Sequence, residues 1–262
     1  MSQQQRLNAV LELVIVRGSI SISEIVDELQ ISAATARRDL NSLAEQRLVT
    51  RTHGGAMALG SGYELPLQYK APRNAVAKTA IAEAVAGMVH FGDVIGLNGG
   101  TTTSEVSRVL GRTEHLMDPG DEPGVTIVTN ALNIAFELSI RPHVKIVVTG
   151  GVARRQSYEL VGPLVGDTIR SLSLDIAILG VDGLSAQFGA TTIHEGEAEV
   201  SRQLASVASR VVIVADSTKV GKSTFARICE LEKIDTLVTD APVASPMREA
   251  FDLAGVEVIV AD

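Results

Sequence analysis

Seven short apolar runs, most of them rich in β-branched residues, follow one another along the chain and are separated by stretches of helical periodicity. They span residues 93–97, 125–128, 144–148, 175–179, 211–215, 235–238 and 256–260. Strands that are apolar on both faces are typical of a parallel sheet that helices cover on each side. The sequence therefore predicts an α/β fold with a mostly parallel sheet, preceded by a helix over 75–88.

The first 57 residues show a different pattern, in which apolar side chains repeat at the spacing of an amphipathic helix. Residues 6–16 carry this repeat, and the segment Ser-Ile-Ser-Glu at 21–24 is a capping box that begins a second, short helix. After a tight connection, Ser32 can cap a third helix. The apolar face of this third helix carries Ala36, Leu40 and Leu43. Two short helices joined in this way predict a helix-turn-helix.

The third predicted helix carries two arginines away from its apolar face. Arg38 lies nearly opposite that face, Arg37 lies on its flank, and Thr35 lies near the N-terminal end, which in DNA-binding helices meets base edges. Residues 48–55 alternate between apolar and polar and end in two glycines, which predicts a small β-wing against a phosphate backbone. Arginine pairs also occur on ordinary solvated helices, so a protein-interaction module is an alternative interpretation of this part of the chain.

The net charge of −8, from 23 basic and 31 acidic side chains, argues at first against a polyanionic partner. However, residues 1–56 contain six basic and six acidic side chains, so the remaining residues carry the whole −8. Within 32–53, four arginines stand against two carboxylates. Salt screens exposed charges beyond about 8 Å, so this local basic patch can bind phosphates despite the distant acidic excess.

Residues 32–40 and 51–56, which read SAATARRDL and RTHGGA, strongly resemble the N-terminal signature of DeoR-type bacterial transcriptional regulators. The resemblance implies a winged helix-turn-helix domain that binds double-stranded operator DNA, with Asp39 orienting the adjacent arginines. The implied DNA-binding residues are Ser32, Thr35, Arg37, Arg38, Arg51 and His53. The family usually has glycine where Arg47 stands. At that position the chain would turn left-handed, which costs arginine roughly 1 kcal/mol.

Residues 58–73 lack a clear periodicity and contain Gly60-Ser61-Gly62, Pro66 and Pro72, a composition typical of a linker. The predicted organisation is therefore a winged helix-turn-helix domain over 1–57, a linker over 58–73 and an effector-sensing α/β domain over 74–262.

Polar turns follow five of the predicted strands. They are the segments 98–103 (NGGTTT), 129–130, 149–151, 180–183 and 216–219. In an α/β sheet such turns meet at the carboxyl edge, where ligands bind, so they predict one site for a small polar ligand. The Gly-Gly-Thr-Thr-Thr turn suits a phosphate, because its amides and hydroxyls and the following helix attract anions. A Gly-Thr turn that merely caps a helix, and a surface role for Lys219, are the structural alternatives.

Residues 78–240 also resemble the C-terminal sensor domain of the DeoR family, whose fold is related to ribose-5-phosphate isomerase and glucosamine-6-phosphate deaminase. The resemblance implies a pocket in which the threonine turn and Lys219 hold a phosphate and other polar side chains bind sugar hydroxyls. The implied effector-binding residues are Asn98, Gly99, Gly100, Thr101, Thr102, Thr103, Asn130, Gly150, Gly151, Asp182, Glu197 and Lys219. Many relatives have aspartate where Asn98 stands.

Together these features predict a DNA-binding transcriptional regulator, usually a repressor in this family, of carbohydrate-metabolism genes. A phosphorylated sugar or related metabolite is expected to modulate its operator affinity. A homo-oligomer, dimer or tetramer, would set two recognition helices about 34 Å apart. The alternative is a sugar-phosphate isomerase or deaminase that uses Asp182 or Glu197 as base and Lys219 as electrostatic stabiliser.

Other site classes find no support in the sequence. Gly221-Lys222-Ser223 ends like a phosphate loop, but Asp216 stands where that loop needs its first glycine. The five histidines lack metal-site spacing, so neither a metal nor another cofactor is expected, and the single Cys229 excludes an internal disulfide. No run of eighteen apolar residues and no secretory leader occurs, which predicts a cytoplasmic protein without a membrane partner.

Overall fold

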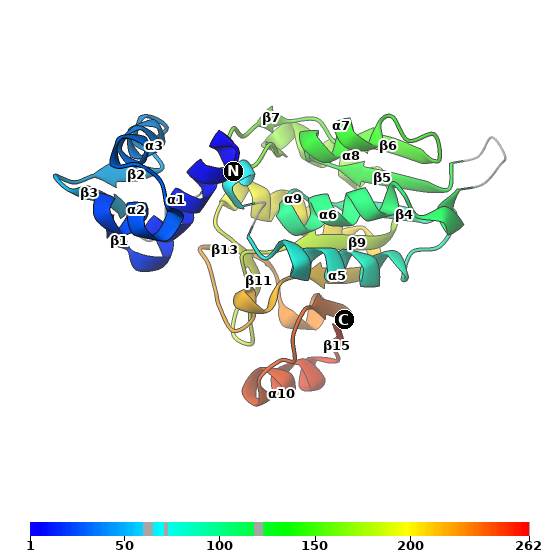
Figure 1. The fold of residues 1–262 in the computed structure, drawn as a ribbon. Helices are drawn as coiled ribbons and strands as arrows, with labels where there is room; N and C mark the ends of the chain where they lie inside the picture. The colour runs from blue at the N-terminus through cyan, green and yellow to red at the C-terminus, as the bar shows by residue number, and fades with distance from the viewer. Residues whose placement is uncertain (60–64, 71–72, 118–122, 262) are drawn as a thin grey trace. The chain divides into compact units, whose positions relative to one another are not determined.

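The computed structural model describes residues 1–59, 65–70, 73–117 and 123–261, and the chain divides into two compact units, Met1–Leu65 and Pro66–Asp262 (Figure 1). Within the predicted linker, Gly60-Ser61-Gly62 and Pro72 lie outside the described residues. The later part of that segment forms the short helix α4, Leu67–Lys70, in which Leu67 and Tyr69 are buried. The Leu67 amide donates a hydrogen bond to the Gln156 carbonyl at 2.7 Å, so this helix belongs to the second unit.

The first unit is a winged helix-turn-helix, as the sequence predicted. Its helices are α1 (Gln3–Arg17), α2 (Ile22–Leu29) and α3 (Ala33–Glu45). Its antiparallel sheet has the order β1-β3-β2, with β1 at Ser19–Ser21, β2 at Val49–Arg51 and β3 at Gly55–Ala58. The predicted caps are present, because the Ser21 side chain accepts from the Glu24 amide in a capping box and the Ser32 side chain accepts from the Thr35 amide.

A bidentate ion pair fastens α1 to α3 inside this unit. Arg6 Nε donates to Asp39 Oδ2 at 2.6 Å, and Arg6 Nη2 donates to Asp39 Oδ1 at 3.1 Å. The Asp39 side chain is only 4% exposed. The family resemblance implied that Asp39 orients the adjacent arginines, but its carboxylate is bound by a guanidinium from another helix. A buried carboxylate requires such a partner, and Arg6 is the one within reach.

The seven predicted apolar runs are the strands of one parallel sheet. Its order is β15-β14-β12-β9-β4-β5-β6, and every neighbouring pair is parallel. The strands are β4 (Val94–Leu97), β5 (Val125–Thr129), β6 (Val144–Val148), β9 (Leu174–Gly180), β12 (Ala208–Val214), β14 (Thr236–Thr239) and β15 (Glu257–Val260). The fold class predicted from the sequence is confirmed.

Helices cover the sheet on both faces and bury one apolar core on each (Figure 1). The first face carries α5 (Ala75–Ala86), α6 (Thr101–Leu110) and α7 (Leu132–Leu138). The second face carries α8 (Pro163–Arg170), α9 (Glu195–Ser206) and α10 (Ser245–Ala254). With both faces buried, the polar groups that follow the strands are confined to the sheet edge.

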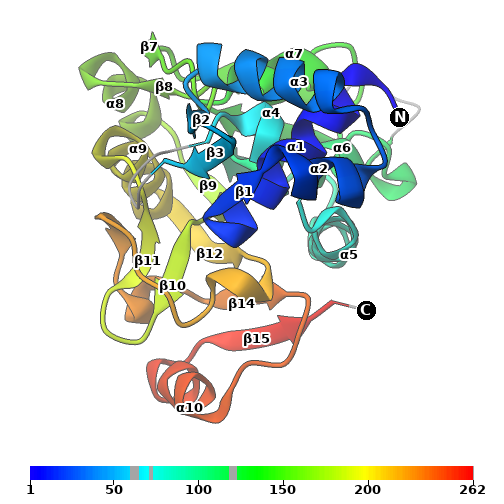
Figure 2. The ribbon, with the colours of Figure 1, turned by 60° about the vertical axis from the view of Figure 1, so that its left-hand side comes forward.

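Two small antiparallel sheets extend the carboxyl side of the main sheet (Figure 2). One consists of β10 (Gly183–Ser185), β11 (Gly189–Thr192) and β13 (Ala226–Cys229), and the other is the hairpin of β7 (Val152–Ala153) and β8 (Leu160–Val161). Three 3-10 helices complete the described elements: η1 (Glu114–Leu116), η2 (Ser217–Lys219) and η3 (Leu231–Lys233). None of the helices within the described ranges has both the length and the apolar content to cross a membrane.

Helix α3 ends in a left-handed residue that is not glycine. Arg47 has φ 57°, its amide donates to the Ala44 carbonyl and the Leu48 amide donates to the Leu43 carbonyl, which is the hydrogen-bond pattern of a Schellman motif. We predict that Arg47→Gly raises the stability of the first unit by about 1 kcal/mol, because glycine adopts this conformation without steric cost. Calorimetric unfolding of the full chain measures this.

The matched control is Arg37→Gly, at an exposed position inside the same helix. It should lower the stability by about 1 kcal/mol, since glycine disfavours a helix interior. A loss of stability in both variants would contradict the explanation.

Candidate functional site

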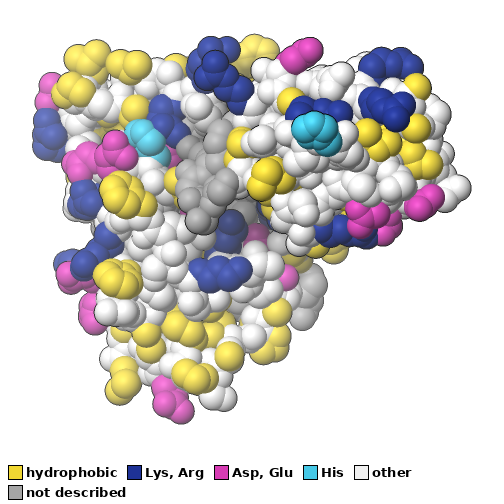
Figure 3. Space-filling view, turned by 90° about the vertical axis from the view of Figure 1, so that its left-hand side faces the viewer, with side chains coloured by type: hydrophobic (Ala, Val, Ile, Leu, Met, Phe, Trp, Pro, Cys, Tyr) yellow, Lys and Arg dark blue, Asp and Glu magenta, His cyan; other side chains and the backbone are white. Residues whose placement is uncertain are grey.

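The outer face of α3 presents two arginines to solvent. Arg37 and Arg38 are exposed, and within the described part of the chain neither guanidinium has an ion-pair partner. Their neighbour Asp39 is bound by Arg6 and therefore leaves both charges uncompensated. The space-filling view in Figure 3 shows Lys and Arg side chains exposed at the surface, with Asp and Glu side chains interspersed among them. The helix can thus offer two positive charges to a polyanion.

The start of α3 is held by hydroxyl groups. Ser32 is exposed and Thr35 is half-buried, and their hydroxyl oxygens lie 2.9 Å apart. Ser32 Oγ also accepts from the Thr35 amide at 3.1 Å. Both predicted residues therefore lie side by side on the first turn, where a helix meets a DNA groove.

The wing places its two predicted residues differently. Arg51 is half-buried and its Nη1 donates to the Gly55 carbonyl at 2.5 Å, so it braces the turn, whereas His53 is exposed at the tip. A Cβ on Gly55 would lie 1.9 Å from the Ile20 carbonyl oxygen. The close pairing of β1 with β3 therefore requires glycine there.

In the second unit, the Gly-Gly-Thr-Thr-Thr turn opens α6. Gly100 has φ 137°, and its carbonyl accepts from Ser104 Oγ at 2.7 Å and from Thr103 Oγ1 at 3.3 Å. Thr102 and Thr103 are buried, and Thr101 is half-buried. Of the three threonines, Thr101 is therefore the one best placed to meet a ligand.

Beneath this turn lies a carboxylate that the sequence analysis missed. Glu159 is buried, and its Oε1 accepts from the Gly99 amide at 3.0 Å and from Asn130 Nδ2 at 3.1 Å. A Cβ on Gly99 would lie 2.2 Å from Glu159 Cγ, so only glycine permits this approach. The available signal was a lone acidic residue that follows the polar segment 154–157 and directly precedes the apolar pair Leu160-Val161.

A second buried carboxylate lies next to the first. Burial, and secondly the charge of Glu197, raise the pKa of Glu159 to about 8. Glu197 itself is bound by Arg154, whose Nε donates to Glu197 Oε1 at 2.8 Å. The hairpin of β7 and β8 supplies Arg154 and Glu159 and thereby links α9 to the glycine turn.

The two predicted asparagines are also engaged with the protein. Asn98 Nδ2 donates to the Gly180 carbonyl at 2.9 Å and to Ser201 Oγ at 3.0 Å, and the Gly180 amide donates to Asn98 Oδ1 at 2.8 Å. Asn130 Nδ2 donates to Glu159 and to the Leu160 carbonyl. Their amide hydrogens thus hold the strand ends together.

The turns after β9 and β12 meet in an ion pair. Lys219 Nζ lies 3.8 Å from Asp182 Oδ1, and Lys70 Nζ lies 3.9 Å from the same atom. Thr192 Oγ1 donates to Asp182 Oδ2 at 2.9 Å. Asp182 and Lys219, which are far apart in the sequence, are therefore brought together.

Gly150 and Gly151 do not join this group. They have φ values of 80° and 119° after the edge strand β6, and a Cβ on Gly151 would lie 2.7 Å from a methyl group of Val165. Their role in the described structure is to turn the chain into the β7–β8 hairpin.

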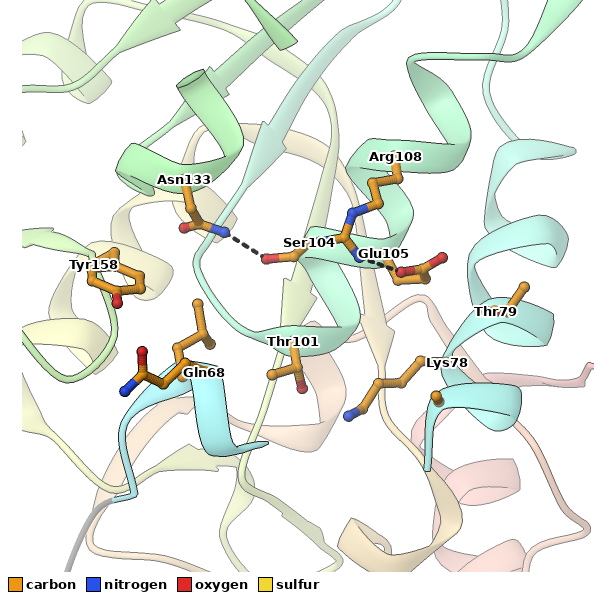
Figure 4. A pocket seen from close by; sticks show the side chains of 11 residues that line it. Gln68, Lys78, Thr79, Thr101, Ser104, Glu105, Arg108, Asn133 and Tyr158 are labelled. Carbon is orange, nitrogen blue, oxygen red and sulfur yellow. Dashed lines mark hydrogen bonds and ion pairs between the residues drawn. The ribbon is translucent and has the colours of Figure 1, made fainter. Parts of the chain in front are cut away.

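A cavity of about 250 Å³ opens beside Thr101 (Figure 4). It is lined by Leu67, Gln68, Ala75, Lys78, Thr79, Thr101, Ser104, Glu105, Arg108, Asn133 and Tyr158. Thr101 is the one predicted site residue among them. Lys78, also missed from the sequence, is 5% exposed, and its Nζ donates to the carbonyls of Lys70 and Arg73. Burial lowers the pKa of Lys78 to about 8.

Comparisons with known proteins agree with these two units. Residues 6–61 match the DeoR-like helix-turn-helix domain, and residues 73–241 match the DeoR C terminal sensor domain. The chain belongs to the DeoR family of transcriptional regulators. The family, the fold class and the regulatory function predicted from the sequence are thereby confirmed.

Several DeoR-family relatives resemble the chain over nearly its whole length. The HTH-type transcriptional regulator GlpR of Haloferax volcanii is 33% identical, over 97% of this chain and 96% of the relative. The Glycerol-3-phosphate regulon repressor of Escherichia coli is 31% identical, over 92% of each. The HTH-type transcriptional repressor GlcR of Bacillus subtilis is 31% identical, over 100% of this chain and 98% of the relative.

Solved structures resemble parts of this DeoR-family chain. Ribose 5-phosphate isomerase A of Methanocaldococcus jannaschii is similar over 56% of this chain and 55% of that protein, with 19% identity and a TM-score of 0.39. Translation initiation factor eIF-2B of Pyrococcus horikoshii is similar over 85% and 68%, with 16% identity and a TM-score of 0.42. Among the described residues, no group of three His, Cys, Asp or Glu side chains could hold a metal ion.

The raised pKa of Glu159 gives the second unit a pH dependence. Burial and the charge of Glu197 raise this pKa from its ordinary value of 4.5 to about 8, so the folded chain keeps the proton over a pH range in which the unfolded chain has lost it. The free energy of unfolding should therefore fall as the pH rises between these values. We predict that Glu159→Gln, which keeps an acceptor for the Gly99 amide, flattens this fall, as measured by denaturant unfolding at several pH values.

Glu195 is exposed on α9, so Glu195→Gln is the matched control. Its free energy of unfolding should change with pH as that of the wild type does. If the free energy of unfolding of Glu159→Gln depends on pH as steeply as that of the wild type, the carboxyl group of Glu159 does not keep its proton on folding.

Proposed function

We propose that this regulator represses carbohydrate-metabolism genes and that a phosphorylated sugar sets its affinity for operator DNA. The observation that carries the proposal is the pair of exposed arginines on α3, left uncompensated because Arg6 binds Asp39. The names of the relatives support it, since one is a repressor of a glycerol-3-phosphate regulon and another is named as a repressor of the aga operon.

The proposed DNA interface is the outer face of α3 together with the wing. Thr35, Arg37 and Arg38 would enter the major groove, while the exposed Ser32 and His53 would contact phosphates. Arg51 would act indirectly by holding the wing turn in shape. The target is double-stranded DNA, so the proposed location is the cytoplasm, where the operator lies.

The proposed effector site is the sheet edge at the start of α6. The Gly100 amide, Thr101 and the ammonium group of Lys219 would bind the phosphate. The charge of the buried Lys78 and the helix dipole would favour an anion there, although the Lys78 ammonium itself donates to backbone carbonyls. Thr102, Thr103, Asn98, Asn130 and Glu197 would position this turn, Asp182 would orient Lys219, and Gly150 and Gly151 would shape the adjoining hairpin.

The effector would regulate by binding the DNA-competent and DNA-incompetent states with different affinity. We propose a homo-oligomer, a dimer or tetramer, because two recognition helices about 34 Å apart fit a two-fold symmetric operator. No catalysis is proposed. The relatives are named as transcriptional regulators. Both carboxylates that could act as bases are paired with cations, Glu197 with Arg154 and Asp182 with Lys70 and Lys219.

We expect Arg38→Ala to weaken operator binding by about 1–3 kcal/mol if its guanidinium reads a base. The duplex is one selected by the wild-type protein from a random pool, and affinity is measured by fluorescence anisotropy. Arg17→Ala is the control, because Arg17 is exposed on α1 and pairs with Glu24 and Glu28. If the wild type, Arg38→Ala and Arg17→Ala bind the duplex with equal affinity, Arg38 on α3 is not part of the DNA interface.

Lys219→Glu should weaken binding of a sugar phosphate at least tenfold, because it places a negative charge at the proposed phosphate site. Calorimetric titration with ribose 5-phosphate, fructose 6-phosphate and glycerol 3-phosphate measures this, and the recovered ligand should be chemically unchanged. Lys222→Glu, an exposed position in the same loop, is the control. Undiminished binding by Lys219→Glu, or turnover of a ligand, would contradict the proposal.

A further inference from the structure

The sheet edge offers few free groups for the hydroxyls of a sugar. Asn98 and Asn130 use both amide hydrogens on the protein, and Glu197 is bound by Arg154. The exception is Asn130 Oδ1, which is buried and has no hydrogen-bond partner among the described residues. A ligand anchored at Thr101 must therefore find most of its other polar partners elsewhere. The cavity between α4, α5, α6 and α7 begins at this threonine (Figure 4).

The cavity is lined by apolar side chains such as Leu67 and Ala75, with uncharged polar groups among them at the end away from Lys78. Tyr158 contributes a hydroxyl group and Gln68 a carboxamide, whereas the Ser104 hydroxyl already donates to the Gly100 carbonyl and accepts from Asn133 (Figure 4). The charge of Arg108 is balanced by Glu105 at 2.6 Å and Glu137 at 3.0 Å. Hydroxyls and amides without net charge fit a polyhydroxyl group better than a second anion.

Asn133 adds an independent indication of a ligand. Its Nδ2 donates to Ser104 Oγ at 2.8 Å, but its Oδ1 is buried and has no hydrogen-bond partner among the described residues. In Figure 4 this oxygen points to the side of Tyr158, away from Ser104. A buried acceptor without a donor is costly, and a ligand hydroxyl at this position would supply the donor.

The opposite end of the cavity is positive. Figure 4 shows the Lys78 side chain extending toward Thr101, at the start of α6. A ligand that lies along the cavity would thus have its anion near Lys78 and its hydroxyls near Ser104, Asn133 and Tyr158. The volume of about 250 Å³ lies just below the usual range of drug-sized sites, roughly 300–1,000 Å³, and suits one monosaccharide rather than a nucleotide.

We infer that this cavity binds the polyhydroxyl chain of a five- or six-carbon sugar phosphate and so selects the effector by length. The inference rests on the proposed function, in which a sugar phosphate is the effector. It differs from the arrangement implied by the family resemblance, in which Asn98, Asn130, Asp182 and Glu197 read the hydroxyls.

Two neighbouring positions on α5 test the inference. Ala75 is exposed and lines the cavity, so Ala75→Phe fills it without altering a core. Val76 is 86% exposed and does not line the cavity, so Val76→Phe is the matched control. Calorimetric titrations use inorganic phosphate, ribose 5-phosphate and fructose 6-phosphate, and the thermal midpoint of each variant verifies folding.

We expect the wild type to bind one of the sugar phosphates at least tenfold more tightly than inorganic phosphate. Ala75→Phe should abolish this advantage while its affinity for inorganic phosphate stays within twofold of the wild type, and Val76→Phe should match the wild type. Gln68→Leu, at an exposed lining position, should reduce the sugar phosphate affinity severalfold and leave inorganic phosphate unchanged.

Three outcomes overturn the inference. If Ala75→Phe binds the sugar phosphate as the wild type does, the cavity is not the subsite and the proposed effector class stands. If Ala75→Phe loses as much affinity for inorganic phosphate as for the sugar phosphate, the cavity does not recognise the sugar. If the wild-type protein binds neither sugar phosphate, the inference fails, and the effector class fails with it only if glycerol 3-phosphate does not bind either.

Discussion

The sensor unit depends on one constraint, which is that all strands of its sheet point the same way while helices bury both faces. Few polar side chains fit along the buried faces of such strands, so most of the predicted site residues follow the strand ends. Four of the five predicted turns therefore meet at one edge, where they and the β7–β8 hairpin satisfy one another's hydrogen bonds in a small space. Two groups of hydrogen bonds are the direct result. One joins Asn98, Gly180 and Ser201, and the other joins Gly99, Asn130 and Glu159.

This crowding explains why several predicted ligand residues bind the protein instead. Groups that hold a turn in one geometry reduce the reorganisation that ligand binding would otherwise require. The glycines take part in the same way, because the backbone of Gly99 approaches Glu159 more closely than any side chain would allow. The open space lies to one side, where α4 and α5 approach the start of α6.

The sequence predicted the features that depend on local chemistry. The caps at Ser21 and Ser32 and the seven strands follow from patterns a few residues long. The left-handed turn at Arg47 was expected from the family resemblance, because the family usually has glycine at that position. The sequence did not predict Asp39 bound to Arg6, because that pair is 33 residues apart and forms only after α1 packs on α3. Lys78 resembled a solvated helix residue, and its burial depends on carbonyl groups eight and five residues away.

The ion pair between Arg6 and Asp39 has a consequence for how the first unit meets a duplex. If Asp39 were paired with Arg37 or Arg38, phosphate binding would have to break an internal bond before forming a new one. Because the carboxylate is already neutralised from α1, the two guanidiniums are exposed without an internal ion pair among the described residues. In the proposed complex, their contact with the double helix would release counterions without breaking an internal bond, and the association constant would fall as the ionic strength rises.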